Sequence, residues 1–315
     1  MPVDLERLEA LASFTDPVMG ISERFVDVPL RSGSTIGVLS LPVGARAATG
    51  WLMSHSFGPE QGNLTALDVA IARRLASRGS PVLRFQCQGY GDSEHATFVP
   101  TIDSHVQDTV DAAGALRELA GVRSIGLVGT RFGASCALLA APEVAADHVA
   151  LIAPAVRGVH FLRELVRSRA VIELSGSAGP GDTPDAWSAL KDGGSISVRG
   201  SLITGDHYRA FDALDLRTTR GFTGSALVMQ VSTGTEPRRG VSELSDRLES
   251  QGVTVTRAVV TDPSAAFLGE RHFRPAERDL LGNIAADLHE KISTAVVDWC
   301  ADAPAATEPE GSARR

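Results

Sequence analysis

The stretch LVGTRFGAS, residues 127 to 135, decides the fold of this chain. It ends an apolar run, places two glycines four positions apart, Gly129 and Gly133, and then continues into a helical pattern. A sharp strand-to-helix turn needs small residues at such positions, because the backbone passes close to its neighbours there. In the G-x-S-x-G frame of a nucleophile elbow the central residue is serine, and here it is Arg131. We therefore predict an intact turn that lacks its nucleophile.

Composition and charge exclude several classes of protein. The chain has 315 residues, 43% of them hydrophobic, and a formal net charge of -8. An acidic chain without clustered Lys and Arg indicates no nucleic-acid partner. The N-terminal residues lack the pattern of a signal peptide, and no apolar run reaches the roughly 18 residues of a membrane span. We expect a cytoplasmic protein with no membrane partner.

The three cysteines, Cys87, Cys136 and Cys300, are odd in number, far apart and without a CxxC motif. This pattern indicates neither a disulfide framework nor a zinc site, so we expect no metal and no cofactor. Asp103, His105 and Asp108 fall on one predicted helix near its start, where carboxylates suit the helix dipole. We interpret these three as structural rather than as metal ligands.

Strand-length apolar runs alternate with longer helical patterns, which predicts an α/β fold with a mostly parallel, eight-stranded sheet and helices on both faces. A single domain is expected over residues 1–301, with a lid insertion at about 156–222, and residues 302–315 are expected to form a disordered tail. The predicted strands are 25–30, 34–41, 50–55, 81–85, 124–129, 148–154, 226–232 and 253–260.

Several segments together resemble the α/β-hydrolase superfamily over roughly residues 23 to 300. They are SHSFGPEQGN (54–63), VLRFQCQGYGDSE (82–94), VGTRFGAS (128–135), SISVRGSLIT (195–204) and FDALDL (211–216). Within the superfamily the chain is similar to the serine-aminopeptidase-like branch, including hydrolase-like proteins associated with the exosortase A system. The resemblance implies an α/β-hydrolase fold and a serine-hydrolase ancestry.

The resemblance also implies roles for particular residues. The loop His55-Ser56-Phe57 matches the position whose backbone N–H, with that of Phe132, stabilises an oxyanion. Glu236, after the seventh predicted strand, matches the acid of a catalytic triad. His272, after the eighth, matches the histidine. Elbow, acid and histidine thus follow in the order of the superfamily.

Arg131 cannot replace serine as a nucleophile, because its guanidinium stays protonated and has no lone pair for attack or general base catalysis. At the N-terminal end of a helix a cation also needs an anionic partner. Two partners are open: Glu236, which would turn the triad remnant into an ion pair, or the carboxylate or phosphate of a ligand.

A displaced nucleophile is a further alternative. Ser135 and Cys136 lie on the helix after the elbow, whereas Ser56 and Cys87 lie near the ends of the third and fourth predicted strands. Each of the four is more often part of ordinary helix or loop structure.

Two functions remain open. In the first, the protein acts on a small ester, thioester, amide or lactone, with His272 as general base, Glu236 orienting it and Arg131 stabilising negative charge. In the second, it is a noncatalytic binding or interaction protein that kept the fold. The expected partner is a small-molecule acyl or anionic substrate, whereas a noncatalytic protein would bind a ligand or a partner protein.

Overall fold

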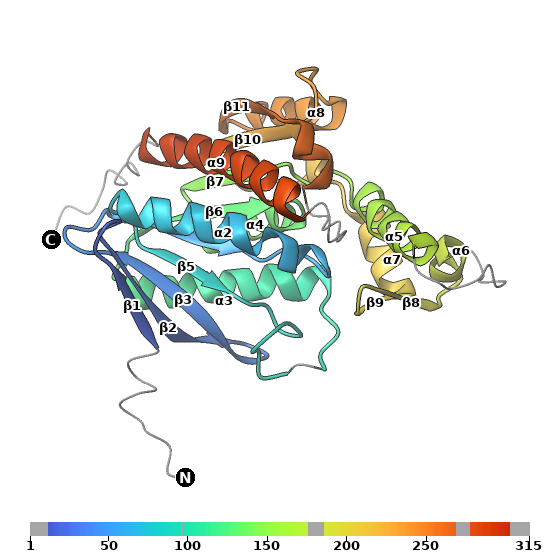
Figure 1. Cartoon of the computed structure of the whole chain (residues 1–315), viewed down its shortest axis with the longest axis horizontal. Coiled ribbons are helices and arrows are strands. Elements are labelled where there is room, and N and C mark those ends of the chain that lie inside the picture. Colours follow the sequence, from blue (N-terminus) through green and yellow to red (C-terminus); the bar gives the residue numbers. More distant parts are fainter. Residues whose placement is uncertain (1–11, 96, 176–185, 269–277, 303–315) are drawn as a thin grey trace, which may run out of the picture.

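A nine-stranded sheet forms the centre of the molecule, in the order β1-β2-β3-β5-β4-β6-β7-β10-β11 (Figure 1). The structure is a computed structural model, and it describes residues 12–95, 97–175, 186–268 and 278–302. The strands are β1 Ser13–Asp16, β2 Ile21–Leu30, β3 Gly33–Pro42, β4 Thr49–Ser54, β5 Val82–Phe85, β6 Ser124–Thr130, β7 His148–Ile152, β10 Ser225–Ser232 and β11 Thr254–Thr261.

The sheet is mostly parallel. β1, β2 and β3 pair antiparallel, and β3 joins β5 antiparallel. The remaining neighbours in the sheet, β5-β4-β6-β7-β10-β11, are all parallel. Every residue of β6 and β10 is buried, as expected for strands covered on both faces. The predicted fold class is confirmed, and all eight predicted strands are present. The short edge strand β1 was not predicted.

Helices cover both faces of the sheet. Helices α2 (Glu60–Ser77) and α9 (Arg278–Asp302) pack together over one face, where Leu67, Ile71 and Ile292 are fully buried. Helices α3 (Ile102–Ala120), α4 (Phe132–Val144) and α8 (Arg239–Glu249) contribute to the core of the other face. None of the helices in the described part of the chain combines the length and apolar character of a membrane span.

Both ends of helix α3 carry residues that are typical of helix ends. The Thr101 hydroxyl caps it by accepting a hydrogen bond from the N–H of Ser104 at 3.0 Å. Gly121 follows the last turn with a φ of 65°, a left-handed conformation that glycine adopts without steric cost. Local signals therefore determine both ends of this helix.

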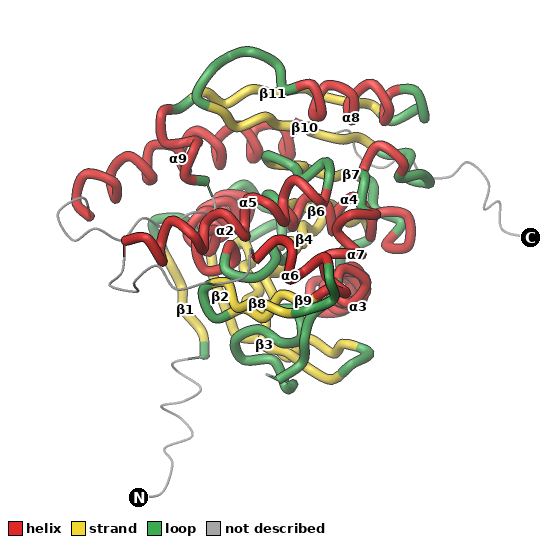
Figure 2. Tube along the Cα trace, turned by 90° about the vertical axis from the view of Figure 1, so that its right-hand side faces the viewer, coloured by secondary structure: helices red, strands yellow, loops and turns green. Residues whose placement is uncertain are grey.

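Residues 158–175 and 186–213 leave the sheet and form a small insertion of their own. It contains α5 (Gly158–Ser175), α6 (Ala186–Lys191), α7 (Gly205–Ala213) and the hairpin of β8 (Ser195–Val198) and β9 (Ser201–Thr204). The insertion projects from one end of the molecule in Figure 1 and faces the viewer in Figure 2. It lies within the range predicted for a lid, and its action as a lid stays a prediction.

The insertion has an aromatic core that it shares with the main sheet. Phe161 and Phe211 of the insertion are buried against Phe57 and Phe132, with ring centroids 5.6 Å apart for Phe132 and Phe161 and 5.0 Å for Phe57 and Phe211. Phe57 follows β4 and Phe132 follows β6. The carboxyl ends of these two strands therefore lie directly beneath the insertion.

The strand order changes direction at this place. The chain places β5 on one side of β4 and then crosses over to place β6 on the other side of β4. Open α/β sheets bind ligands outside the carboxyl ends of the strands at such a switch point. The loops after β4 and β6 are therefore the expected place of a binding site.

Candidate functional site

The turn after β6 has the backbone of a nucleophile elbow. Arg131 has φ 58° and ψ -118°, a conformation that is strained for a residue with a side chain. A Cβ on Gly129 would lie 2.2 Å from the carbonyl oxygen of Gly133, and one on Gly133 would lie 2.5 Å from that of Ser54. Both glycines are therefore required by close backbone contacts, as the sequence predicts.

The Arg131 side chain forms two ion pairs. Its Nε lies 3.1 Å from Oε1 of Glu60, the first residue of α2, and its Nη2 contacts the carboxylate of Glu164 on α5. The guanidinium carbon also lies 5.7 Å from the ring centroid of Phe161. Arg131 thus joins the elbow, α2 and the insertion.

The two carboxylates differ in their exposure to water. The Glu60 side chain is 5% exposed and that of Glu164 is 53% exposed. Burial raises the pKa of Glu60, and the neighbouring Arg131 opposes this rise. Burial by itself lowers the pKa of Arg131, but the charges of Glu60 and Glu164 raise it above its usual value. Arg131 is therefore a permanent cation at the elbow.

Arg131 does not pair with Glu236, which was the first of its two possible partners. Glu236 lies on the exposed loop after β10, where its backbone carbonyl accepts a hydrogen bond from Nε2 of Gln230 at 2.8 Å. Arg131 turns instead toward the start of α2, where Glu60 supplies a buried carboxylate close to the helix N-terminus. His272 lies outside the described residues, so its predicted role stays a prediction.

The candidate oxyanion residues come together, but beneath the surface. His55, Ser56, Phe57 and Phe132 are all buried, and the rings of Phe57 and Phe132 lie 5.4 Å apart. The Ser56 N–H donates to Oε1 of Gln61 at 3.1 Å, so it is already occupied. A role of Phe57 and Phe132 as oxyanion donors stays a prediction.

The alternative nucleophiles are all inaccessible. Ser135 and Cys136 are fully buried in α4, and the Ser135 hydroxyl donates to the carbonyl of Ala155. Cys87 is fully buried, and burial raises its pKa well above the usual value. Ser56 is 3% exposed, with its hydroxyl 3.4 Å from Glu60. In this conformation none of these groups can reach a substrate at the surface.

A pocket of about 520 Å³ opens beside Arg131. It lies at the carboxyl ends of β6, β7 and β10, between α5 of the insertion and the start of α8. The lining residues are Arg131, Ala153, Pro154, Ala155, Val156, Arg157, His160, Phe161, Glu164, Arg217, Gln230, Val231, Arg238, Arg239, Gly240, Val241 and Glu243. The predicted oxyanion residues and Glu236 are not among them.

The pocket combines an apolar wall with an excess of positive charge. Alanine, proline, valine and phenylalanine side chains line part of it, and five arginines face two glutamates. Such a lining suits a small ligand that has an apolar part and an anionic group.

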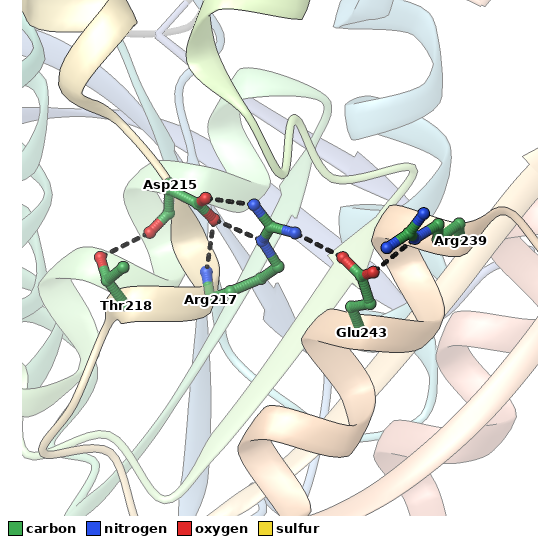
Figure 3. Close-up of polar contacts among 5 residues, drawn as sticks. All are labelled: Asp215, Arg217, Thr218, Arg239 and Glu243. Carbon is green, nitrogen blue, oxygen red and sulfur yellow. Dashed lines mark hydrogen bonds and ion pairs between the residues drawn. The ribbon is translucent and has the colours of Figure 1, made fainter.

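One wall of the pocket is held by a charged network (Figure 3). Arg217, in a short 3-10 helix at Leu216–Thr218, donates through Nε to Oδ1 of Asp215 at 2.8 Å and also pairs with Glu243 of α8. Arg239 reaches the other oxygen of Glu243 at 2.6 Å. The network connects the segment that follows the insertion to α8 and so holds these two parts of the pocket wall together.

Two pocket arginines are left without such a partner. Arg157 and Arg238 are exposed and form no ion pair with any residue in the described ranges, although Asp215 lies near enough to Arg157 to interact with its charge. The N–H of Arg238 donates to Oε1 of Gln230 at 2.6 Å, which anchors its backbone. These two guanidinium groups are therefore available to an anion.

Solved structures resemble this chain over most of its length. Est1E from Butyrivibrio proteoclasticus, determined with ferulic acid bound, has a TM-score of 0.62 and 14% identity over 88% of this chain and 98% of its own. A Pyrococcus furiosus esterase has a TM-score of 0.54 and 12% identity over 92% and 96%. The chain has the α/β-hydrolase fold.

A third solved structure also shares this fold. An α/β serine hydrolase from Xanthomonas campestris, described as lacking a lid, has a TM-score of 0.52 and 18% identity over 90% of this chain and 97% of its own. No family model matches the sequence, and no curated protein matches it. At such low identity the α/β-hydrolase fold is shared, and the chemistry must be argued from the site.

Sequence reasoning missed the partners of Arg131 and the arginines of the pocket. Glu60 has one local signal, because it is an acidic residue in the first turn of the helix after the third predicted strand. Glu164 and Arg157 have no comparable signal, because Glu164 reaches the site only through the folding of the insertion and Arg157 lies in the loop directly before it. Arg163 of α5 is exposed, and its guanidinium carbon lies 5.0 Å from the centroid of the Trp187 ring.

Proposed function

We propose that the protein binds a small anionic acyl compound in the pocket beside Arg131 and forms no acyl-enzyme at the elbow. The observation that carries this proposal is the elbow itself, which presents a fixed cation where a nucleophile would stand. The expected ligand has an apolar acyl chain and a carboxylate or phosphate. The apolar wall would contact the chain, while Arg157 and Arg238 would bind the anion.

Matched probes test the charge preference. We expect hexanoate and hexyl phosphate to bind in isothermal titration calorimetry, with affinities that fall as salt rises. Methyl hexanoate, which keeps the chain and lacks the charge, should bind at least about tenfold more weakly. Equal binding of the neutral ester, or no binding of either anion, would contradict the proposal.

A covalent probe tests the absence of an acyl-enzyme. A fluorophosphonate should not label the unmodified chain under conditions in which an active serine hydrolase, added to the same sample, is labelled completely. Mass spectrometry of peptides then locates any adduct. A label on any residue of the elbow or the pocket would show a reactive nucleophile there and would refute the absence of an acyl-enzyme.

Hydrolysis by activated water is the second candidate, supported by the fold likeness to esterases. Here His272 would be the general base, Glu236 would orient it, and Arg131 would stabilise developing negative charge. Slow release of nitrophenol from p-nitrophenyl hexanoate that is lost in His272→Ala would favour this candidate. An unchanged rate in that variant would exclude it.

The finer family assignment belongs to the same proposal. We place the chain in the serine-aminopeptidase-like branch, near the hydrolase-like proteins of the exosortase A system, on the likeness of residues 54–63, 82–94, 128–135 and 195–204. A ligand with a small acyl group is compatible with this placement.

A further inference from the structure

Two histidines and a cysteine form a buried cluster behind the loop that follows β4. His55 belongs to this loop, Cys87 to the loop after β5, and His105 to the first turns of α3. One ring nitrogen of each histidine and the Cys87 sulfur all lie within 4.8 Å of one another. His55 is 2% exposed, and the other two are fully buried. None of the three lines the pocket beside Arg131.

Hydrogen bonds determine the tautomer of both histidines. Nδ1 of His55 lies 2.7 Å from the carbonyl oxygen of Ser56, and Nδ1 of His105 lies 2.8 Å from that of Thr101. A carbonyl oxygen can only accept a hydrogen bond, so each Nδ1 carries the proton. Each Nε2 therefore has a free lone pair, and burial lowers the pKa of both rings, to about 3 for His55 and about 4 for His105.

Neither Nε2 has a hydrogen-bond partner within the described ranges, although both atoms are buried. A buried acceptor without a partner costs about 1–3 kcal/mol, so two of them beside a thiol need an explanation. A histidine that donates Nδ1–H to a backbone carbonyl and leaves Nε2 free has the arrangement of a metal ligand. Imidazole and thiolate together suit thiophilic ions such as Zn²⁺ and Cu⁺.

We propose that His55, Cys87 and His105 bind one thiophilic d¹⁰ metal ion, Zn²⁺ or Cu⁺. Ligand atoms at about 2.0–2.3 Å from a metal lie about 3.3–3.8 Å from one another. Because all separations in the cluster are at most 4.8 Å, none of them has to close by more than about 1–1.5 Å. This site is distinct from the anion pocket, and its failure would leave the proposed function untouched.

Two negative charges beside the cluster would balance the charge of a metal ion buried there. The charge of the nearby Asp108 carboxylate adds to burial in raising the pKa of the Cys87 thiol, and this carboxylate accepts a hydrogen bond from the N–H of Gln88 at 2.9 Å. When the metal binds, the S–H bond breaks, a sulfur–metal bond forms and the proton passes to solvent. The thiolate and the Asp108 carboxylate then neutralise the two charges of Zn²⁺. Because a proton is released, metal affinity falls as the pH falls.

The metal would stabilise the loop beside the elbow. The rings of His55 and Tyr90 lie 4.5 Å apart, and the Tyr90 hydroxyl accepts from the N–H of Gly58 at 2.8 Å. His105 packs on Phe57 with centroids 5.5 Å apart. Binding at His55 and His105 would therefore hold residues 55–58 in place, and we assign the ion a structural role.

The test measures metal bound per chain. The full chain is purified with a reductant, stripped with a chelator, and then dialysed against Zn²⁺ or, without oxygen, against Cu⁺. We expect about one ion per chain in at least one arm, and a rise of several degrees in the thermal midpoint. Co²⁺ should give a thiolate-to-cobalt charge-transfer band in the near ultraviolet. The proposal would be overturned if the chain held no more than background amounts of metal after dialysis against either ion, or if the cobalt spectrum lacked that band.

Variants locate the ion. Cys87→Ser and His105→Gln should each weaken binding by at least about 100-fold and abolish the cobalt band, while Cys300→Ser, whose cysteine lies on α9 away from the cluster, should leave both unchanged. Circular dichroism confirms that each variant is folded. Full binding by both folded cluster variants would refute the site, and the spectrum of the unmodified chain decides the matter if either variant fails to fold.

Discussion

Arg131 at the elbow and Glu60 at the start of α2 form an ion pair, with Nε 3.1 Å from Oε1 and the Glu60 side chain 5% exposed. At the central position of the elbow, where the G-x-S-x-G pattern has a hydroxyl, this pair holds a cation in place from its buried side. It also relieves the repulsion between a cation and the N-terminal end of α4. The same contact explains why Arg131 does not turn toward Glu236.

Removal of the charge of Glu60, the buried partner of Arg131, should destabilise the fold more than removal of the charge of Glu164, its exposed partner. Glu60→Gln leaves the buried side of the Arg131 guanidinium without a charge, so we expect a loss of about 2–4 kcal/mol in the free energy of unfolding. Glu164→Gln, at a side chain that is 53% exposed, should cost at most about 1 kcal/mol. Urea denaturation measures both, and equal losses would show that burial does not set the strength of this contact.

The glycines of the elbow should not tolerate a methyl group. In Gly129→Ala and Gly133→Ala the new Cβ would meet backbone atoms at 2.2 Å and 2.5 Å, so we expect a loss of about 3 kcal/mol or more, or failure to fold. Gly114→Ala is the matched control, because Gly114 lies in α3 with nothing within 4 Å of the new atom. There the higher helix propensity of alanine should add about 0.5–1 kcal/mol. A tolerated Gly129→Ala would mean that the turn is not tightly packed.

The unpaired arginines should contribute to ligand affinity. Arg157→Gln and Arg238→Gln should each weaken the binding of hexyl phosphate by about tenfold and flatten its salt dependence, because each removes one charge from the pocket. Arg46→Gln, in the exposed loop between β3 and β4, removes the same charge away from the pocket and should have no effect. Calorimetry at two salt concentrations separates these cases. Similar losses in all three variants would indicate a nonspecific effect of net charge.

Stability should respond to pH through Asp68 on α2. Burial raises the pKa of Asp68 to about 7, while the charge of Arg84 opposes the rise. The folded state therefore holds this proton more tightly than the unfolded state, whose pKa is about 3.9. The resulting stabilisation is complete below about pH 4 and is lost as the pH rises through about 7.

Asp68→Asn isolates this effect. The variant should match the parent near pH 4 and exceed it by about 1–2 kcal/mol at pH 8, since water still reaches part of the side chain. Denaturation curves at several pH values measure the difference. A gain that does not grow with pH would show that Asp68 ionises freely in the folded protein.

Local patterns predicted most of the fold. The burial of β6 and β10, the caps of α3 and the glycines of the elbow are all encoded within a few neighbouring residues. The candidate site was harder to predict. Chain order suggested Glu236 as the partner of Arg131, but the loop after β10 is held by Gln230 with the Glu236 side chain in solvent. Chain order specifies which loops face the site and not which side chains enter it.

By itself the sequence determined the α/β fold and the presence of an arginine at the centre of the elbow, because strand periodicity, turn glycines and the chemistry of a guanidinium are properties of single residues and their near neighbours. Only the tertiary structure decided which anion Arg131 meets. Glu60 and Glu164 lie 71 and 33 positions from it along the chain, and they reach it because the switch in strand order brings α2 and the insertion over one strand end. The cluster of His55, Cys87 and His105 has the same origin, since three distant segments meet only where parallel strands end side by side.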